Sequence, residues 1–320
     1  MAVFSSVLST EGIKMSSTYY TLDVFSDTKF QGVQVAVFPH AETLAENLSE
    51  TVFIYPVDDS TFKLRVFSPS AEIDFAGHPI LAAVHVLAET DQLSLSGDYT
   101  SVTIKQNAQD VIANISVDEK GVKFVQFTLQ SNPVVDRYTP PGSELAKLLS
   151  IDENDIDHTN YHTRLVSGGL PYLVVPVKSQ EAVRKARFDL KAWAQSSAPA
   201  IAAQEILLFS AKTNSSDSNF HARLLGPSIG FKEDPPIGSA MPAFTGYLSS
   251  HDHIREGTYS FAIDRGTADS RRSLLHIEMD KHASRPVTLR VGGDSVLVSK
   301  SELFVAYSDS VDEHIGKIKT

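Results

Sequence analysis

An internal repeat is the feature of this sequence that most constrains its fold. Residues 62–70, FKLRVFSPS, align with residues 220–228, FHARLLGPS, so that Phe, Arg, Pro and Ser fall at matching places. With three residues inserted in the second copy, the match continues into a glycine loop and a helical run, at Gly77 and at Gly238. Such repeats indicate two copies of one supersecondary unit. The sequence therefore predicts two α/β domains of one fold, related by a pseudo-two-fold axis, with a cleft between them where small molecules usually bind.

Short strand-like runs, interrupted by a few helical stretches, make up both halves of the chain. The 320 residues suffice for two domains at roughly 150 residues each. Runs rich in β-branched and aromatic residues predict strands at residues 18–25, 33–38, 51–56, 62–67, 111–117, 122–129, 171–177, 205–209 and 220–225. Apolar residues at helical spacing predict helices at residues 41–48, 79–89, 180–193 and from about 238.

The strongest linker signal follows residue 131. Asn132-Pro133 and Thr139-Pro140-Pro141-Gly142 are typical of turns and connections. We therefore predict an N-terminal domain over residues 15–131 and a C-terminal domain over residues 132–320, whose last segment has room to pack back on the first domain. Met15 is a second possible start, so residues 1–14 are expected to form a poorly ordered extension.

Charge and composition exclude several classes of protein. The 39 Asp and Glu residues against 28 Lys and Arg residues give a formal net charge of −11, which repels phosphate backbones and predicts no nucleic-acid partner. The chain has no cysteine, which excludes disulfides, thiolate metal sites and cysteine nucleophiles. No apolar run reaches the ~18 residues of a membrane span, and residues 1–14 lack a secretory signal pattern. We therefore predict a cytoplasmic protein that does not enter the membrane.

Both copies of the repeat pass through a glycine into a helix. Gly77-His78-Pro79 opens one helix and Gly238-Ser239 opens the other. The unpaired N–H groups and the positive dipole end at such a start attract anions. If the two starts face one cleft, they can hold a carboxylate and stabilise the negative charge that develops when a carbon acid loses its proton. Ordinary backbone geometry is the alternative explanation for a glycine before a helix.

A few polar residues lie at or near these helix starts. His78 follows the first glycine, and Glu233 and Asp234 precede the second glycine, where acids most often cap a loop. Glu50 lies between a helical run and an apolar strand, and composition cannot separate it from the other acids. His251-Asp252-His253 lacks a third ligand, so we predict a solvated loop and no metal site. The nucleotide-binding and α/β-hydrolase motifs are absent, and we predict no cofactor.

In their order and spacing, these residues resemble the PhzF-like family of phenazine-biosynthesis proteins, which shares the diaminopimelate epimerase fold. The resemblance runs from about Tyr19 to Val305. The segments that carry it are residues 23–27 with 30–32, 48–51, 65–79, 169–177, 233–240 and 290–293.

The resemblance implies an α+β fold of two pseudo-symmetric domains, each a mostly antiparallel sheet wrapped around a central helix, with the active site in the cleft between them. It also implies proton transfer without a cofactor, and a homodimer. The epimerase branch of this fold has cysteines at the two glycine loops. The branch that this chain resembles has His and Ser there, here His78 and Ser239.

The residue-by-residue match assigns roles. It implies that Glu50 is the acid/base that shuttles the proton, and that His78, Asp234 and Ser239 position or protonate the substrate. The residues expected to bind the substrate are Gly77, Gly238, Ile237, Val33 and Tyr172. Val33 and Ile237 stand where the family commonly has polar residues, which favours a more apolar substrate than the phenazine precursor.

The leading hypothesis is a cofactor-independent isomerase that moves a proton between carbons of a small acidic or cyclic metabolite. One alternative is a cyclase that uses the same acid and base on a larger natural-product intermediate. The other alternative is a member of the fold that binds a ligand without turnover.

Overall fold

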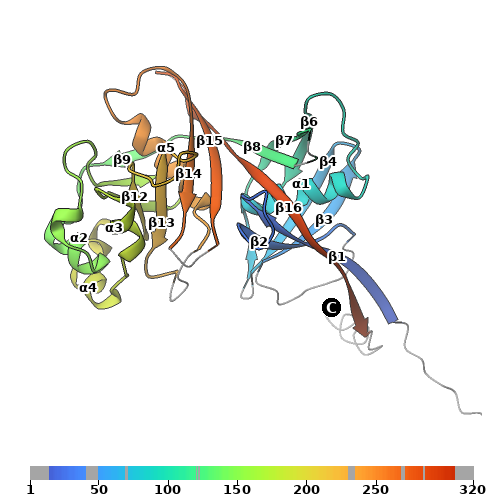
Figure 1. Cartoon of the computed structure of the whole chain (residues 1–320), viewed down its shortest axis with the longest axis horizontal. Helices are drawn as coiled ribbons and strands as arrows, with labels where there is room; N and C mark the ends of the chain where they lie inside the picture. The colour runs from blue at the N-terminus through green and yellow to red at the C-terminus, as the bar shows by residue number, and fades with distance from the viewer. Residues whose placement is uncertain are drawn as a thin grey trace, which may run out of the picture.

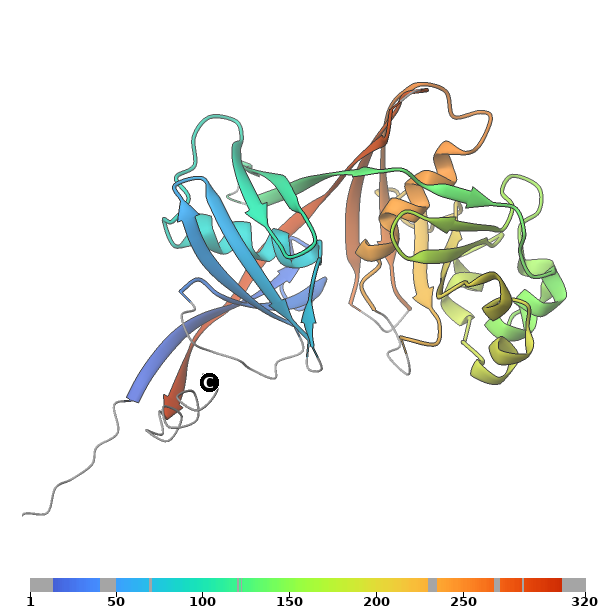
Figure 2. The ribbon, with the colours of Figure 1, turned by 180° about the vertical axis from the view of Figure 1, so that it is seen from behind.

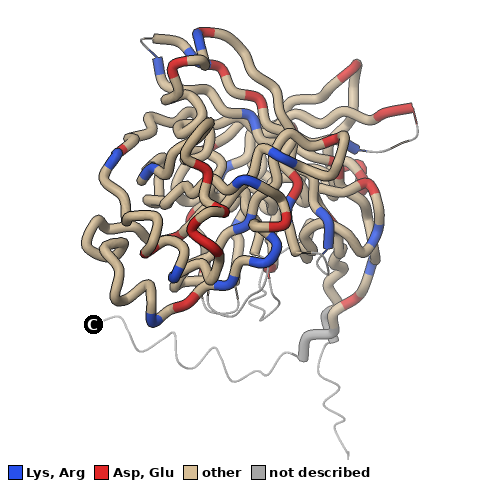
Figure 3. The backbone as a smooth tube through the Cα atoms, turned by 60° about the vertical axis from the view of Figure 1, so that its left-hand side comes forward, with Lys and Arg blue, Asp and Glu red and all other residues tan. Residues whose placement is uncertain are grey.

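The computed structural model is a mixed α/β protein, and it describes residues 14–40, 50–68, 71–119, 121, 123–229, 235–267, 271–283 and 285–306. The helix predicted at residues 41–48 and nearly all of the predicted N-terminal extension lie outside the described residues. Acidic and basic residues are interspersed along the described backbone (Figure 3). No helix in the described ranges is both long enough and apolar enough to cross a membrane.

The elements form two series, which are drawn on the right and on the left of Figure 1, and the last strand of the second series crosses to the right. The first comprises β1 (Lys14–Val24), β2 (Val33–Phe38), β3 (Thr51–Asp58), β4 (Thr61–Phe67), β5 (Glu72–Ile73), α1 (His78–Glu89), β6 (Thr100–Lys105), β7 (Asp110–Val117) and β8 (Lys123–Ser131). The second comprises β9 (Val134–Asp136), α2 (Gly142–Leu149), β10 (Arg164–Ser167), β11 (Pro171–Pro176), α3 (Gln180–Lys185), α4 (Leu190–Gln195), β12 (Glu205–Ser210), β13 (Phe220–Leu225), α5 (Met241–Ser249), β14 (Gly257–Arg265), β15 (Ser273–Lys281) and β16 (Val287–Ala306). Three short 3₁₀ turns complete the second series: η1 (Glu153–Asp155), η2 (Pro199–Ile201) and η3 (Gly238–Ala240).

The long strand β16 joins the two series. It pairs antiparallel with β15 and β8 along its first part and with β1 along its last part (Figures 1 and 2). Strands β1, β2, β3, β4, β6, β7 and β8 are hydrogen-bonded in that order, so the two pairings with β16 close them into a ring. Helix α1 contacts strands from all around this ring, and residues 78–87 of the helix are buried on every side. A helix that is apolar all round needs such an enclosure.

The order of strand pairings in the first series recurs in the second. The pair β2–β3 is parallel, β3–β4 antiparallel and β4–β6 parallel, and antiparallel pairs lead on to β7 and β8. The pairs β11–β12, β12–β13 and β13–β14 repeat this alternation, and antiparallel pairs lead on to β15 and β16. Helix α1 lies between β4 and β6 in the chain, and α5 lies between β13 and β14. The sequence repeat falls on β4 and β13, so it marks a repeated arrangement of strands.

Two hydrophobic clusters lie on the two faces of β11, β12 and β13. The larger cluster surrounds α1 and α5 and includes Phe220, Ala222 and Leu224 of β13. The smaller cluster lies beneath α2, α3 and α4 and includes Leu225. Because both faces of β13 are covered, all six of its residues are buried. In β4 buried residues alternate with partly exposed ones, as in a strand with one covered face.

Several predicted elements are confirmed and two predictions are corrected. Strands β2 and β13 have the predicted bounds, and α1 begins one residue early. The helix predicted over residues 180–193 is two helices, α3 and α4. Buried Arg223 donates to the carbonyl oxygens of Val183 and Ala186 at 3.0 Å, which gives partners to carbonyls left free where α3 ends. The predicted linker leads directly into α2, because Pro141 tolerates the position before a first helical turn.

A buried carboxylate ties the first series to the segment before β15. Asp23, at the end of β1, is fully buried and accepts from the N–H of Phe30 at 2.6 Å and from Nη1 of Arg271 at 3.0 Å. The N–H of Gly32 donates to the carbonyl oxygen of Arg272 at 2.7 Å. Gly32 has φ +66°, and a Cβ there would overlap the carbonyl oxygen of Val24, so only glycine fits. The 25–32 loop is therefore fixed against the 271–274 segment.

Replacing Asp23 with Ala should lower the free energy of unfolding by about 1–3 kcal/mol, because it leaves a partly buried N–H and a half-exposed guanidinium without their acceptor. Urea unfolding at neutral pH measures the loss. Asp27→Ala is the control, because Asp27 is exposed and, among the described residues, accepts a side-chain hydrogen bond from its neighbour Thr28 alone. It should change the value by less than ~0.5 kcal/mol. Equal losses in the two variants would contradict this account of Asp23.

Candidate active site

Glu50 and His78 meet, although they lie in different elements. Glu50 directly precedes β3, and its carbonyl oxygen accepts from the N–H of Ala36 at 3.1 Å as part of the parallel β2–β3 pairing. His78 is the first residue of α1. Its Nε2 contacts Oε2 of Glu50, and the two side chains are 10% and 24% exposed. The structure thus brings together a carboxylate and an imidazole that both remain within reach of solvent.

Packing explains the glycine that precedes His78. A Cβ at Gly77 would lie 2.6 Å from the ring atom Cζ of Phe127 in β8, which is too close for any side chain. The buried amide of Gln106 holds the adjacent Ala76, accepting from its N–H at 2.8 Å and donating to its carbonyl at 3.0 Å. No side chain caps the first turn of α1. These contacts hold the loop in place. Pro79 has no N–H, and the N–H of Ile80 donates to the carbonyl oxygen of Gly77 at 3.0 Å, so among the described residues the backbone N–H of His78 is the one left at this helix start.

The second glycine start has different neighbours. Ser239 lies in η3, directly before α5, and its Oγ accepts from the hydroxyl of Tyr172 at 3.1 Å. Burial raises the pKa of the Tyr172 phenol, so the hydroxyl keeps the proton that it donates. A Cβ at Gly238 would meet no described atom within 4 Å. Space at this position is open, in contrast to Gly77.

Of three other residues expected at the site, two are buried and one lies outside the described residues. Val33 and Ile237 are buried in the larger hydrophobic cluster, at 8% and 1% exposure. Asp234 lies outside the described residues, and so does the neighbouring Glu233. In this structure Val33 and Ile237 are core residues.

Strand register identifies a second carboxyl group that the sequence analysis missed. In the sequence repeat Phe67 corresponds to Leu225. Phe67 pairs with Thr51, and Leu225 pairs with Ile206. The residue before Ile206 is Glu205, which therefore corresponds to Glu50. The chain from Ile206 to Leu225 is three residues longer than the chain from Thr51 to Phe67. An alignment of the repeat without a gap therefore does not match Glu205 with Glu50.

Glu205 lies in a more enclosed setting than Glu50. It is 7% exposed, and its Oε1 accepts from the N–H of Ser228 at 3.2 Å. Its Oε2 is buried and has no hydrogen-bond partner among the described residues. Glu205 pairs with Tyr172 across β11 and β12, and burial raises the pKa of its carboxyl. The second series thus places a carboxyl, a phenol and a hydroxyl near one another, where the first has a carboxyl and an imidazole.

Comparison with known proteins identifies the family. The model of the PhzC–PhzF family, described as phenazine biosynthesis-like protein, matches residues 22–301. The chain belongs to this family. An uncharacterized isomerase of Mesorhizobium japonicum is 29% identical over 303 residues, which cover 90% of this chain and 98% of the relative. The trans-2,3-dihydro-3-hydroxyanthranilate isomerase of Pseudomonas aeruginosa is 23% identical over 300 residues, which cover 90% and 99%. The predicted resemblance is confirmed, and the chain is an isomerase of the PhzC–PhzF family.

Solved structures show the same fold. A PhzF-family protein of Bacillus anthracis superposes with a TM-score of 0.79 at 20% identity, covering 91% of this chain and 100% of that one. A hydroxyproline epimerase of Agrobacterium vitis, solved with trans-4-hydroxy-L-proline bound, gives a TM-score of 0.58 at 10% identity, covering 92% and 93%. The PhzC–PhzF chain therefore shares its mixed α/β fold with an amino-acid epimerase.

Gly77→Ala tests whether packing fixes the loop at His78. The added methyl group would collide with the ring of Phe127, so the free energy of unfolding should fall by about 1–3 kcal/mol. Adding Phe127→Leu should recover part of this loss, because it removes the colliding ring atoms. Urea unfolding of both single variants and the double variant gives the coupling. Strictly additive losses would contradict the proposed contact.

Glu205 should make stability depend on pH. Because burial raises the pKa of its carboxyl, its contribution is fully present below the ordinary pKa of glutamate, ~4.3, and is lost as the pH rises through the raised value. Glu205→Gln, which imitates the neutral acid, should remove this part of the dependence and be more stable than the wild type at pH 8. Urea unfolding of both proteins between pH 4.5 and 8 measures how the free energy of unfolding depends on pH. The exposed Glu119→Gln should keep the wild-type profile, and an unchanged profile in Glu205→Gln would refute the assignment.

Proposed function

We propose that this PhzC–PhzF protein is a cofactor-independent isomerase that moves a proton between two carbons of a small acidic or cyclic metabolite. The observation that carries the proposal is the contact between Glu50 and His78 at the uncapped start of α1. A carboxylate held by an imidazole can take a proton from carbon and return it, which is the chemistry of a general acid/base.

The proposed reaction needs one proton and no other reactant. Oε2 of Glu50 is engaged by His78, and the other oxygen, Oε1, takes the proton from the first carbon of the substrate. The electrons of the broken C–H bond move into the conjugated system of the substrate, and the backbone N–H of His78 at the start of α1 stabilises the charge that develops. Glu50 then returns the proton to the second carbon, so the product is an isomer and the enzyme is restored.

We further propose that the two series of strands are two domains, residues 15–131 and 132–320, related by a pseudo-two-fold axis, with the substrate in a cleft between them. The repeated order of strand pairings supports this division. Ser239 and Tyr172 would hold the polar group of the substrate from the second domain, beside the open space at Gly238. We also propose that Asp234 positions or protonates the substrate and that the protein is a homodimer, and both proposals rest on the family resemblance alone.

The core positions of Val33 and Ile237 bear on the substrate. Both are buried in the cluster that surrounds α1 and α5, so they lie behind the surface of the proposed cleft. The less polar substrate is proposed because these apolar residues stand where the family commonly has polar ones. A useful panel therefore contains trans-2,3-dihydro-3-hydroxyanthranilate, trans-4-hydroxy-L-proline and more apolar cyclic acids.

Solvent isotope exchange tests the proposal directly. The wild type should incorporate deuterium from D₂O into a substrate of the panel, seen by NMR as loss of one C–H signal. Glu50→Gln should lower the exchange rate by about 10²–10⁴-fold, because it removes the general base. Glu119→Gln, on an exposed turn, is the control and should exchange like the wild type.

Two results would count against the proposed roles. Exchange that survives Glu50→Gln would exclude Glu50 as the proton carrier. Binding of a panel member without exchange in the wild type would favour the alternative of a protein that binds its ligand without turnover.

A further inference from the structure

A second polar site lies in the second series, and its lining includes neither Glu50 nor Ser239. A pocket of about 280 Å³ is lined by α3, by the loop between β12 and β13, and by the residues around the end of β14 and the start of β15. The side chains on which the argument rests are Gln180, Arg184, Asp264, Arg265 and Arg272. The proposed isomerase reaction uses none of them.

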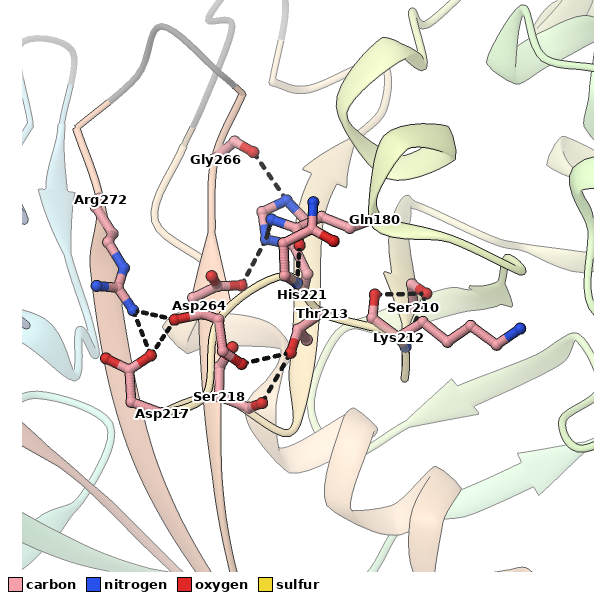
Figure 4. Close-up of polar contacts among 12 residues, drawn as sticks. Gln180, Ser210, Lys212, Thr213, Asp217, Ser218, His221, Asp264, Gly266 and Arg272 are labelled. Carbon is pink, nitrogen blue, oxygen red and sulfur yellow. Dashed lines mark hydrogen bonds and ion pairs between the residues drawn. The ribbon is translucent and has the colours of Figure 1, made fainter.

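The negative charge of Asp264, the acid that lines this pocket, is neutralised by the fully buried His221. Nδ1 of His221 lies 2.5 Å from Oδ1 of Asp264, and its Nε2 lies 2.9 Å from the carbonyl oxygen of Gly266 (Figure 4). A carbonyl oxygen only accepts, so Nε2 carries a proton. The Nδ1 contact then needs a proton on the ring or on the carboxyl, and in both cases the pair of side chains is neutral overall. Asp264 therefore does not cancel the charge of the arginines.

Three arginines contribute positive charge to the same pocket. Nε of Arg184 is buried and has no hydrogen-bond partner among the described residues. Arg265 is 6% exposed and donates to the hydroxyl of Ser273 at 3.1 Å and to the carbonyl of Pro235 at 3.2 Å. Arg272 pairs with Asp217 at 2.7 Å at the pocket's rim (Figure 4). In a chain of net charge −11, three arginines thus line one pocket.

We propose that this pocket binds a small anion that carries a phosphate or carboxylate group. The guanidinium groups offer paired N–H donors that match both kinds of oxyanion. The cavity of about 280 Å³ has room for a compact metabolite. Arg184 is the lining arginine to test, because its guanidinium forms no ion pair with the described residues and so keeps its charge for a ligand.

The pocket lies next to the contact between the 25–32 loop of the first series and the 271–274 segment of the second. The N–H of Arg272 donates to Oε1 of Gln31 at 2.7 Å, and its carbonyl accepts from Gly32. The side chain of the same residue lines the pocket. An anion bound there would therefore contact a residue, Arg272, that also holds the 25–32 loop against the 271–274 segment.

Isothermal titration calorimetry with inorganic phosphate and with malonate tests the proposal at low ionic strength. At least one of these anions should bind the wild type, and the one that binds identifies the chemical class. Arg184→Gln should weaken that binding by about tenfold or more, as expected for a charge-assisted hydrogen bond. Arg255→Gln removes the same charge from an exposed loop outside the pocket and should bind like the wild type.

A second variant keeps the test decisive if Arg184→Gln fails to fold. Arg272→Gln alters a half-exposed side chain at the rim and should also weaken binding. Absence of binding of both anions to the wild type would overturn the proposal. Wild-type affinity in every folded pocket variant would overturn it as well, because the anion would then be held elsewhere. Exchange activity measured separately distinguishes this result from a failure of the proposed isomerase function.

Discussion

The pairing of β16 with strands of both series is the interaction on which the rest of the structure depends. A helix as apolar as α1 can be buried only if strands surround it, and β16 supplies the last strand of that ring by pairing with β1 and β8. The same strand continues the sheet into β15 and so into the strands around α5. Because the backbone hydrogen bonds of one strand serve both series, the two helix starts are parts of one continuous framework.

The repeat gives the two halves the same backbone and different chemistry. Glu50 and Glu205 precede corresponding strands, yet Glu50 is partly exposed and meets His78, whereas Glu205 is enclosed beside Tyr172. The arginines of the repeat diverge in the same way. Arg65 pairs with Glu72 through two hydrogen bonds at 2.9 and 2.8 Å, whereas Arg223 holds the end of α3. Such divergence is expected when two copies of a sheet keep the same strand register while different helices and loops pack against each of them.

The sequence analysis located the elements that local pattern specifies. Alternating apolar residues gave β2 and β13, and the run after Gly77 gave α1. It could not find the break between α3 and α4, because the side chain that gives partners to the carbonyls where α3 ends comes from Arg223, forty residues away along the chain. The family resemblance singled out Glu50 and His78 as site residues, and the structure places them in contact. Glu205 escaped detection because only the strand register reveals its counterpart.

The sequence by itself determined the family, the repeated order of elements and the residue types available for proton transfer, since these depend on the identity and spacing of residues along the chain. Only the tertiary structure decided which polar groups became neighbours. The contact of Glu50 with His78, the burial of Val33 and Ile237, and the neutral pair in the arginine-lined pocket all depend on long-range strand pairing. Burial and hydrogen bonding set the chemistry of each group, and both arise only when distant segments pack together.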